Sequence, residues 1–313
     1  MSQTKIACRG VWKIFGPTPA RIAQTVTPQM TRGQVLETTG HVLAVRAVSF
    51  DVQEGEIFVV MGLSGSGKST LIRCLSRLVD PTLGSIIVNG EDVTAMNDAQ
   101  LRLLRRNKMS MVFQRFGLFS HRRVLDNIAF GLEVQGMPKE QRLARAQAIL
   151  ELVELSGWEN YYPHELSGGM QQRVGLARAL AVDPEILLCD EPFSALDPLI
   201  RRDMQNELIR LQKNLRKTIV FITHDFLEAI KIGDRIAVMK DGEIVQVGTP
   251  EQIVAHPVND YVREFTKDVP RVKVLTARSV MQPVYTKEQL IGRAIAIDTT
   301  LEALIPLTVD SDE

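Results

Sequence analysis

A single stretch, GLSGSGKST at positions 62–70, constrains the fold of this chain more than any other feature of its sequence. It follows the apolar run EIFVVM and precedes the helical pattern LIRCLSRL. Its glycines let the backbone turn several N–H groups toward one anion, and the start of the following helix adds positive charge. Strand, glycine-rich loop and helix in this order predict a phosphate-binding loop within an α/β domain. A Gly/Ser-rich loop that only imitates the pattern is the alternative, which the flanking strand and helix disfavour.

The positions of this loop have separate roles in a nucleotide site. Lys68 is expected to bridge the β- and γ-phosphates of a nucleoside triphosphate, and the Ser69 hydroxyl to coordinate Mg²⁺. The backbone N–H groups and small side chains of the loop surround the phosphates. The predicted nucleotide-binding residues are Gly62, Ser64, Gly65, Ser66, Gly67, Lys68, Ser69 and Thr70.

Two adjacent carboxylates, Asp190 and Glu191, end the apolar run EILLC. Ligands of α/β proteins bind at the carboxyl edge of the parallel strands, where this pair would lie beside the phosphate-binding loop. Asp190 is suited to holding Mg²⁺, and Glu191 to orienting and polarising a water that attacks the γ-phosphate. An acidic pair that merely ends a strand is the less favoured interpretation. The loop and the pair together predict a nucleoside triphosphatase.

A second candidate phosphate site precedes the helix MQQRVGLARALAVD. In LSGGMQQR, Ser167 and the flexible Gly168 and Gly169 form another helix start that can bind phosphate. One nucleotide needs no second clamp unless the clamp serves another subunit. At this point the sequence resembles the ATP-binding cassette (ABC) ATPases, whose LSGGQ signature completes the partner's site in a head-to-tail dimer. Met170 departs from the commonest glutamine, whereas Gln171 and its neighbours fit.

The resemblance implies roles for four more residues. Gln114, after MSMVF, matches the glutamine that contacts magnesium and the attacking water, and His224 matches the histidine that senses the γ-phosphate. Asp197 matches the loop that crosses the dimer interface, and Phe15 stands at the place of the aromatic platform for adenine. The alternatives are a strand-end glutamine, a structural histidine, a helix N-cap and a core aromatic, and Trp12 is the rival platform.

Strand-type and helical segments alternate along most of the chain, which predicts a mostly parallel sheet with an antiparallel part at its ends. The resemblance extends over residues 7–266 and assigns 1–269 to one nucleotide-binding domain with a P-loop NTPase core. A helical subdomain is expected at about 115–166, and an insertion of loop or short helix at about 17–42. Residues 270–313 are too few for a sizeable core and are expected to form a C-terminal appendage.

Composition limits the function classes. Lys+Arg and Asp+Glu are balanced at 37 each, which argues against a protein that binds a nucleic-acid backbone. Cys8, Cys74 and Cys189 show no CxxC spacing, so neither a disulfide framework nor a zinc site is expected. No apolar run approaches the roughly 18 residues of a membrane-spanning helix. We therefore expect a cytoplasmic protein that reaches a membrane only through a partner.

The longer phrases resemble one branch of the family. EGEIFVVMGLSGSGKSTLIRCLSRL, DEPFSALDPLIRRDMQNEL and IVFITHDFLEA resemble the ATP-binding subunits of glycine betaine, proline and choline importers. The resemblance implies an ATPase that works as a homodimer with ATP and Mg²⁺. It implies a transmembrane permease that holds the dimer at the cytoplasmic face of the inner membrane, and an extracytoplasmic solute-binding protein. The tail faintly resembles the start of one CBS regulatory module and is too short for the tandem pair usual in this branch.

The helical segment after Gln114 is the expected contact with that permease. Residues 116–124, FGLFSHRRV, mix apolar and basic side chains, as a hydrophobic anchor rimmed by charge requires. A solvated loop is the alternative.

Rival functions fit the sequence less well. A cassette ATPase of DNA repair or chromosomes would carry a long coiled coil between the phosphate loop and the signature, but Ser167 follows Lys68 by 99 residues without sustained heptads. Translation-type members carry two cassettes in one chain, and each motif occurs once here. A subunit that binds ATP without turnover would be expected to lack Glu191 or His224. An importer of a different amine or of an amino acid stays open.

Overall fold

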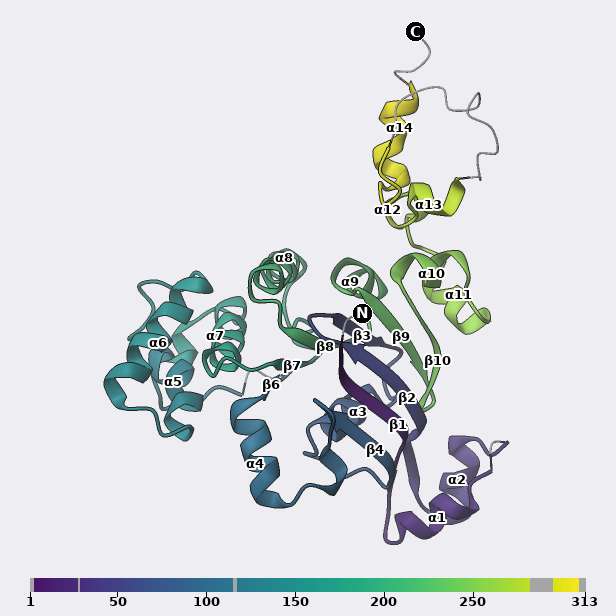
Figure 1. Ribbon diagram of the computed structural model, residues 1–313, viewed down its shortest axis with the longest axis horizontal. Coiled ribbons are helices and arrows are strands. Elements are labelled where there is room, and N and C mark those ends of the chain that lie inside the picture. The colour runs from purple at the N-terminus through teal and green to yellow at the C-terminus, as the bar shows by residue number, and fades with distance from the viewer. Residues whose placement is uncertain (1–2, 28, 115–116, 282–294, 310–313) are drawn as a thin grey trace.

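Two sheets form the centre of the protein, a helical bundle lies beyond one edge of the larger sheet, and a group of C-terminal helices projects from the molecule (Figure 1). The computed structural model describes residues 3–27, 29–114, 117–281 and 295–309. Strands and helices alternate along the chain, so the predicted α/β class is confirmed.

The larger sheet has six strands and is mostly parallel. Only β10 pairs antiparallel, with β9, which confirms the expected antiparallel end. Strands β3, β7 and β8 are buried along their whole length, as expected for parallel strands covered on both faces. The order across the sheet is β10 (Glu243–Gly248), β9 (Arg235–Lys240), β3 (Ile57–Met61), β8 (Thr218–Thr223), β7 (Ile186–Asp190) and β6 (Met109–Val112).

The smaller sheet is antiparallel and encloses the first long helix of the core. Helix α3 (Lys68–Leu75) buries Leu71, Ile72 and Leu75 among side chains from both sheets. Phe50 stacks on Phe58 of the larger sheet with ring centroids 4.9 Å apart, which joins the two sheets directly. This packing fixes the N-terminus of α3 at the end of β3. The order of the smaller sheet is β2 (Val42–Gln53), β1 (Thr4–Phe15), β4 (Leu83–Val88) and β5 (Glu91–Asp92).

Two helices cover the other face of the larger sheet. Helices α8 (Pro198–Leu215) and α9 (Phe226–Ile232) pack their apolar sides on β3, β7 and β8 in one continuous core. Asp197 caps the start of α8 by accepting the N–H groups of Leu199 and Ile200. Helix α4 (Asp98–Asn107) precedes β6 at the edge of the sheet.

The helical bundle consists of α5 (Val124–Val134), α6 (Lys139–Leu152) and α7 (Gly168–Ala181), which pack against one another. Fully buried Asn127 organises the loop that leads into α5. Its amide oxygen accepts the N–H of Phe119 at 2.8 Å, and its amide nitrogen donates to the carbonyl groups of Phe119, Arg122 and Arg123 at 3.0–3.1 Å. One side chain thus satisfies four backbone groups.

The insertion between β1 and β2 folds into two helices, α1 (Pro19–Thr25) and α2 (Arg32–Thr39). A capping box of Thr31 and Gln34 starts α2. Buried Val35 holds this helix on Ile14 and Leu43 in a small core of its own.

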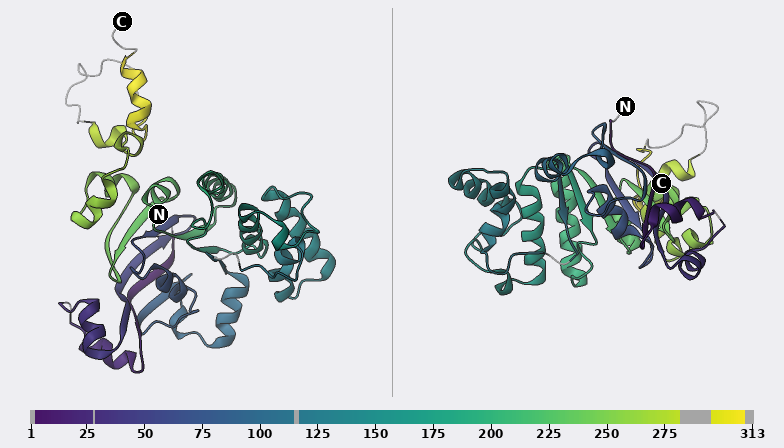
Figure 2. Two further views of the ribbon diagram at one scale, coloured as in Figure 1. Left: turned by 180° about the vertical axis from the view of Figure 1, so that it is seen from behind. Right: turned by 90° about the horizontal axis from the view of Figure 1, so that it is seen from below.

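Five short helices and one isolated antiparallel β-bridge, between Thr276 and Thr300, make up the described C-terminal part after β10. Helices α10 (Pro250–Ala255) and α11 (Asp260–Thr266) follow β10, and α12 (Arg271–Val274), α13 (Ala277–Val280) and α14 (Leu301–Val309) project beyond them (Figure 2). Residues 282–294 and 310–313 of the CBS-like segment lie outside the described residues. Within the described ranges, no helix is both long and apolar enough to cross a membrane.

We expect Asn127→Ala to lower the free energy of unfolding by about 3 kcal/mol, because buried backbone groups lose their partners. Urea unfolding followed by circular dichroism measures this change. Asn206→Ala, at an exposed asparagine of α8, is the control and should change stability by less than about 0.5 kcal/mol. Equal stability of both variants would contradict the structural role of Asn127.

Candidate functional site

The loop 62–70 passes so close to other backbone segments that two of its positions exclude a side chain. A Cβ at Gly62 would lie 2.2 Å from the carbonyl oxygen of Met239, and a Cβ at Gly67 would lie 2.3 Å from that of Ala44. Both glycines have positive φ, at +155° and +109°. Helix α3 begins at Lys68, so its free N–H groups face the loop.

The Lys68 ammonium is almost completely buried inside the loop. It donates to the carbonyl oxygens of Gly62 at 2.8 Å and Leu63 at 3.1 Å, and lies 3.5 Å from a carboxylate oxygen of Glu191. Burial lowers the pKa of Lys68, and the negative charge of Glu191 opposes that shift. A cation held this way is available to a phosphate that enters the loop.

Ser69 and Asp190 meet although they are far apart in the sequence. The Ser69 hydroxyl donates to Oδ1 of Asp190 at 2.7 Å, and Arg73 lies 3.4 Å from Oδ2. These oxygen donors fit the proposed Mg²⁺ ligands, because this ion takes one or two protein ligands together with phosphate oxygens and waters. Where the structure is described, no group of three or more His, Cys, Asp or Glu side chains could hold a metal by itself.

Glu191 directly follows β7 in a left-handed conformation, with φ at +46°, which is uncommon for a residue with a side chain. Its carboxylate lies 2.9 Å from Nδ1 of His224, which follows β8. The strained backbone is stabilised by a 3.1 Å hydrogen bond from its N–H to the carbonyl of Ile222. The carboxylate is thus held between Lys68 and His224.

Gln114, two residues after the edge strand β6, is linked to Glu191 through the hydroxyl of Ser194. Its amide nitrogen donates to the hydroxyl of Ser194 at 3.2 Å, and that hydroxyl donates to the backbone carbonyl of Glu191 at 3.0 Å. The residue that follows β6 is therefore linked to the residue that follows β7.

Lys68, Ser69, Gln114 and Glu191 line one cavity of about 530 Å³, and Asp190 and His224 contact this group without being among the described residues of the lining. Phe15, 42% exposed, lines it at the end of β1, so of the two aromatic candidates Phe15 borders the cavity. Lys13 lies over the Phe15 ring with its ammonium 4.8 Å from the ring centroid. Trp12 lines a different cavity beside Arg46. The lining also includes Ser64, Gly65, Gly67, Lys68, Ser69, Thr70, Gln114 and Glu191.

The second candidate phosphate site lies elsewhere. Ser167 caps α7 by accepting the N–H of Met170 at 3.3 Å, and is exposed together with Gly168. A Cβ at Gly169 would lie 2.4 Å from Ile200 of α8, so the two helix starts are packed together. Gln171 donates to the carbonyl of Leu166 at 3.1 Å. None of the four predicted signature residues is among the described residues that line the 530 Å³ cavity.

Comparison with known proteins agrees with this geometry. The pattern of the ABC transporter family matches residues 45–194. A glycine betaine transport ATP-binding protein of Bacillus subtilis is 55% identical over 282 residues, which cover 90% of this chain and 68% of that protein. The chain belongs to the ABC transporter family. Its predicted family, its P-loop fold and its classification as an ATPase are thereby confirmed.

Two further comparisons extend the relationship of this cassette. A trimethylamine N-oxide transport system ATP-binding protein of Ruegeria pomeroyi is 50% identical over 310 residues, which cover 99% of this chain and 90% of that protein. A dimeric structure of an ATP-binding cassette in a post-hydrolysis state, bound to ADP and Pi, superposes with a TM-score of 0.66 at 32% identity. It covers 78% of this chain and 98% of that one.

Sequence reasoning missed the contribution of the insertion to the cavity of this cassette. Arg32 and Leu36 of α2 line it beside the phosphate loop, and Arg32 donates to the carbonyl oxygens of Gly65 at 2.6 Å and Ala44 at 2.5 Å. The capping-box spacing of Thr31 and Gln34 could have revealed the helix. No local pattern indicates where that helix packs.

We expect Glu191→Gln to lower the ATPase rate at least about 100-fold while ATP still binds, because only the carboxylate that polarises water is removed. Phosphate release and binding of radiolabelled ATP measure the two properties. Glu185→Gln makes the same change at the opposite end of β7 and should leave the rate unaltered. Equal rates in Glu191→Gln and the parent would refute this role.

Proposed function

We propose that this chain is the ATP-hydrolysing subunit of an importer for a small solute with a quaternary ammonium or amine N-oxide group, such as glycine betaine, choline or a proline-type betaine. The observation that carries the proposal is the identity of 50–55% to the named glycine betaine and trimethylamine N-oxide transport proteins, over 90–99% of this chain. The chemistry of the cavity supplies the driving reaction.

In the proposed reaction, Glu191 orients the attacking water and accepts its proton. Lys68 and the N–H groups at the start of α3 stabilise charge on the phosphates, and His224 keeps the carboxylate of Glu191 in place. Mg²⁺, held by Ser69, Asp190 and Gln114, would neutralise phosphate charge when it is bound. Phe15 is the proposed platform for adenine.

Two copies of the chain would share each nucleotide. The loop of one copy would bind the phosphates, and Ser167 with Gly168 and Gly169 of the other would complete the site. Two facts support this: the signature lies outside its own chain's cavity, and the structurally similar cassette is a dimer. Asp197 caps α8, whose Ile200 packs against Gly169 of the signature, and it is the residue that would cross the interface.

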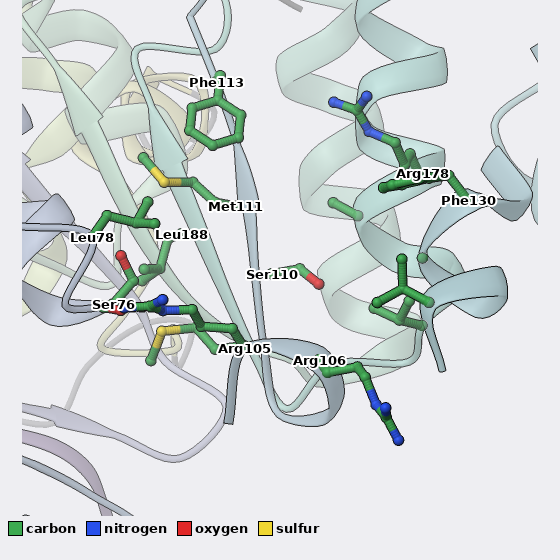
Figure 3. A pocket seen from close by; sticks show the side chains of 15 residues that line it. Ser76, Leu78, Arg105, Arg106, Ser110, Met111, Phe113, Phe130, Arg178 and Leu188 are labelled. Carbon is green, nitrogen blue, oxygen red and sulfur yellow. Dashed lines mark hydrogen bonds between the residues drawn. The ribbon is translucent and has the colours of Figure 1, made fainter. Parts of the chain in front are cut away.

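A groove between the sheet and the helical bundle is the proposed docking surface for the permease. This cavity of about 290 Å³ separates residues of β6 from those of α5 and α7 (Figure 3). Exposed apolar side chains of Leu78, Phe113 and Val134 line it, rimmed by Arg105 and Arg178. Basic and apolar groups together suit an anchor from a membrane protein.

The segment expected from the sequence to meet the permease borders this groove. Phe119 packs on Phe130 of the groove lining with centroids 4.6 Å apart, and Arg122 lies over both rings. Phe116 lies outside the described residues. Docking here would hold the dimer at the cytoplasmic face of the inner membrane, beneath a permease supplied by an extracytoplasmic solute-binding protein.

We expect Ser167→Arg to lower the ATPase rate about 100-fold, because the long side chain occupies the place of a phosphate contact in the partner's site. Calorimetric ATP affinity of the monomer should change less than about twofold, since the two sites are separate within one chain. Ser156→Arg, at an exposed serine of the same bundle, is the control. Loss of monomer affinity would exclude a role in trans.

Uptake in cells tests the transport proposal. Deleting the gene should abolish uptake of labelled glycine betaine, choline or trimethylamine N-oxide, and the parent chain should restore it whereas Glu191→Gln should not. A multispan permease should co-purify with the tagged chain from solubilised membranes. Unchanged uptake of all three solutes, with ribosomal or DNA-bound partners instead, would contradict the proposal.

A further inference from the structure

Three large apolar side chains that line the nucleotide cavity remain half exposed. Phe15 and Val42 lie opposite each other on β1 and β2, and Leu36 comes from the inserted helix α2. Their exposed fractions are 42%, 51% and 49%. All three line the cavity that contains Lys68 and Ser69. A cavity lined by both apolar and cationic side chains suits a nucleotide, whose base is flat and whose phosphates are charged.

The orientation of Leu36 follows from its neighbour. Val35 is fully buried against Ile14 and Leu43, so it fixes the rotation of α2. Successive residues of an α-helix are about 100° apart, because one turn takes 3.6 residues. Leu36 is therefore turned away from the small core and toward the cavity that it lines.

Phe15 supplies only one free face to this end of the cavity. The Lys13 ammonium lies over its ring, 4.8 Å from the centroid, and cation–π attraction favours that placement. A base stacked on the remaining face still has edges and a second face to cover. Leu36, on helix α2, lines the same cavity and can cover these parts of the base.

Arg32 holds this helix on the phosphate loop. One guanidinium nitrogen donates to the Gly65 carbonyl of the loop at 2.6 Å, and another to the Ala44 carbonyl of β2 at 2.5 Å. At the other end of the insertion, His41 is close to Thr39 O at 2.7 Å through Nδ1 and accepts the N–H of Thr18 at Nε2. The insertion is thus fixed near the start of β2 by His41 and to the phosphate loop by Arg32.

We propose that α2 forms a second wall of the base site, with Leu36 contacting the purine of the nucleotide and Arg32 acting as the positioning residue that holds this wall against the phosphate loop. The proposal rests on the nucleotide site proposed above and assigns a ligand contact to the insertion.

A comparison of ADP with pyrophosphate distinguishes binding of the base from binding of the phosphates, because only ADP carries a base. Neither ligand is hydrolysed at an ATPase site. Calorimetry on the full chain with Mg²⁺ should show that Leu36→Ala weakens ADP binding about fivefold, the effect of one lost apolar contact, and leaves pyrophosphate affinity unchanged. Leu103→Ala, at a leucine of similar exposure on α4, should alter neither affinity. Thermal unfolding without ligand verifies that each variant is folded.

A double-mutant cycle tests the positioning role. Arg32→Ala should weaken binding of both ligands, because the loop and the wall lose their common support. In the Arg32→Ala background, Leu36→Ala should cost less ADP affinity than it does alone. Arg32→Lys should restore part of the affinity, since one ammonium replaces two parallel donors.

The outcomes are distinguishable. A parent chain that binds neither ligand would refute the proposed nucleotide site itself. If the parent binds both, unchanged ADP affinity in Leu36→Ala overturns the base contact. Equal losses for ADP and pyrophosphate in that variant would overturn it as well, because the side chain would then act through the loop. Fully additive effects in the cycle would refute the positioning role of Arg32.

Discussion

The close approach of the phosphate loop to two backbone carbonyl groups is the constraint on which the rest of the site depends. Gly62 packs against the carbonyl of Met239 on β9, and Gly67 against that of Ala44 on β2. These strands belong to different sheets, so the loop lies where both sheets meet. Any Cβ at either glycine would push the sheets and the loop apart. Because the loop fits there, the Lys68 ammonium and the first N–H groups of α3 face the cavity. Within the described strands, neither sheet uses these donors in its own hydrogen bonds.

Glu191 has a strained backbone and contacts residues from several segments of the chain. A positive φ at a residue with a side chain costs of the order of 1–3 kcal/mol, and contacts with Lys68, His224 and Ile222 offset that cost. Lys68 and Glu191 balance each other's charge in the absence of a nucleotide. In the proposed reaction, a triphosphate that draws Lys68 toward its own oxygens would leave the carboxylate to His224 and to water. The same ion pair therefore keeps both groups in place before either is needed.

The sequence predicts those parts of the structure whose chemistry is set by neighbouring residues. The phosphate loop requires its glycines and Lys68 within a few positions, so the motif indicates both the fold and the ligand. Arg32 and Leu36 could not be predicted in this way. Their contacts depend on how the insertion folds back over β2, and only the capping box of α2 is visible locally. The proposed role of Ser167 also depends on a second chain. The sequence of one chain indicates such a contact only through the presence of a second phosphate-binding motif.

Strand β6 gives a physical path between the two cavities. Met109 and Met111 line the groove proposed for the permease, and Gln114, which follows the same strand, lines the nucleotide cavity. The strand is hydrogen-bonded to β7, the strand that ends at Asp190. Met109 and Val112 at the two ends of β6 are buried, and their packing together with the hydrogen bonds to β7 resists stretching of the strand. In the proposed importer, a permease segment docked in the groove would contact β6 and Phe113, and a nucleotide would contact Gln114, the next residue along the chain. In the proposed importer, β6 is therefore the element through which the groove and the nucleotide cavity would be coupled.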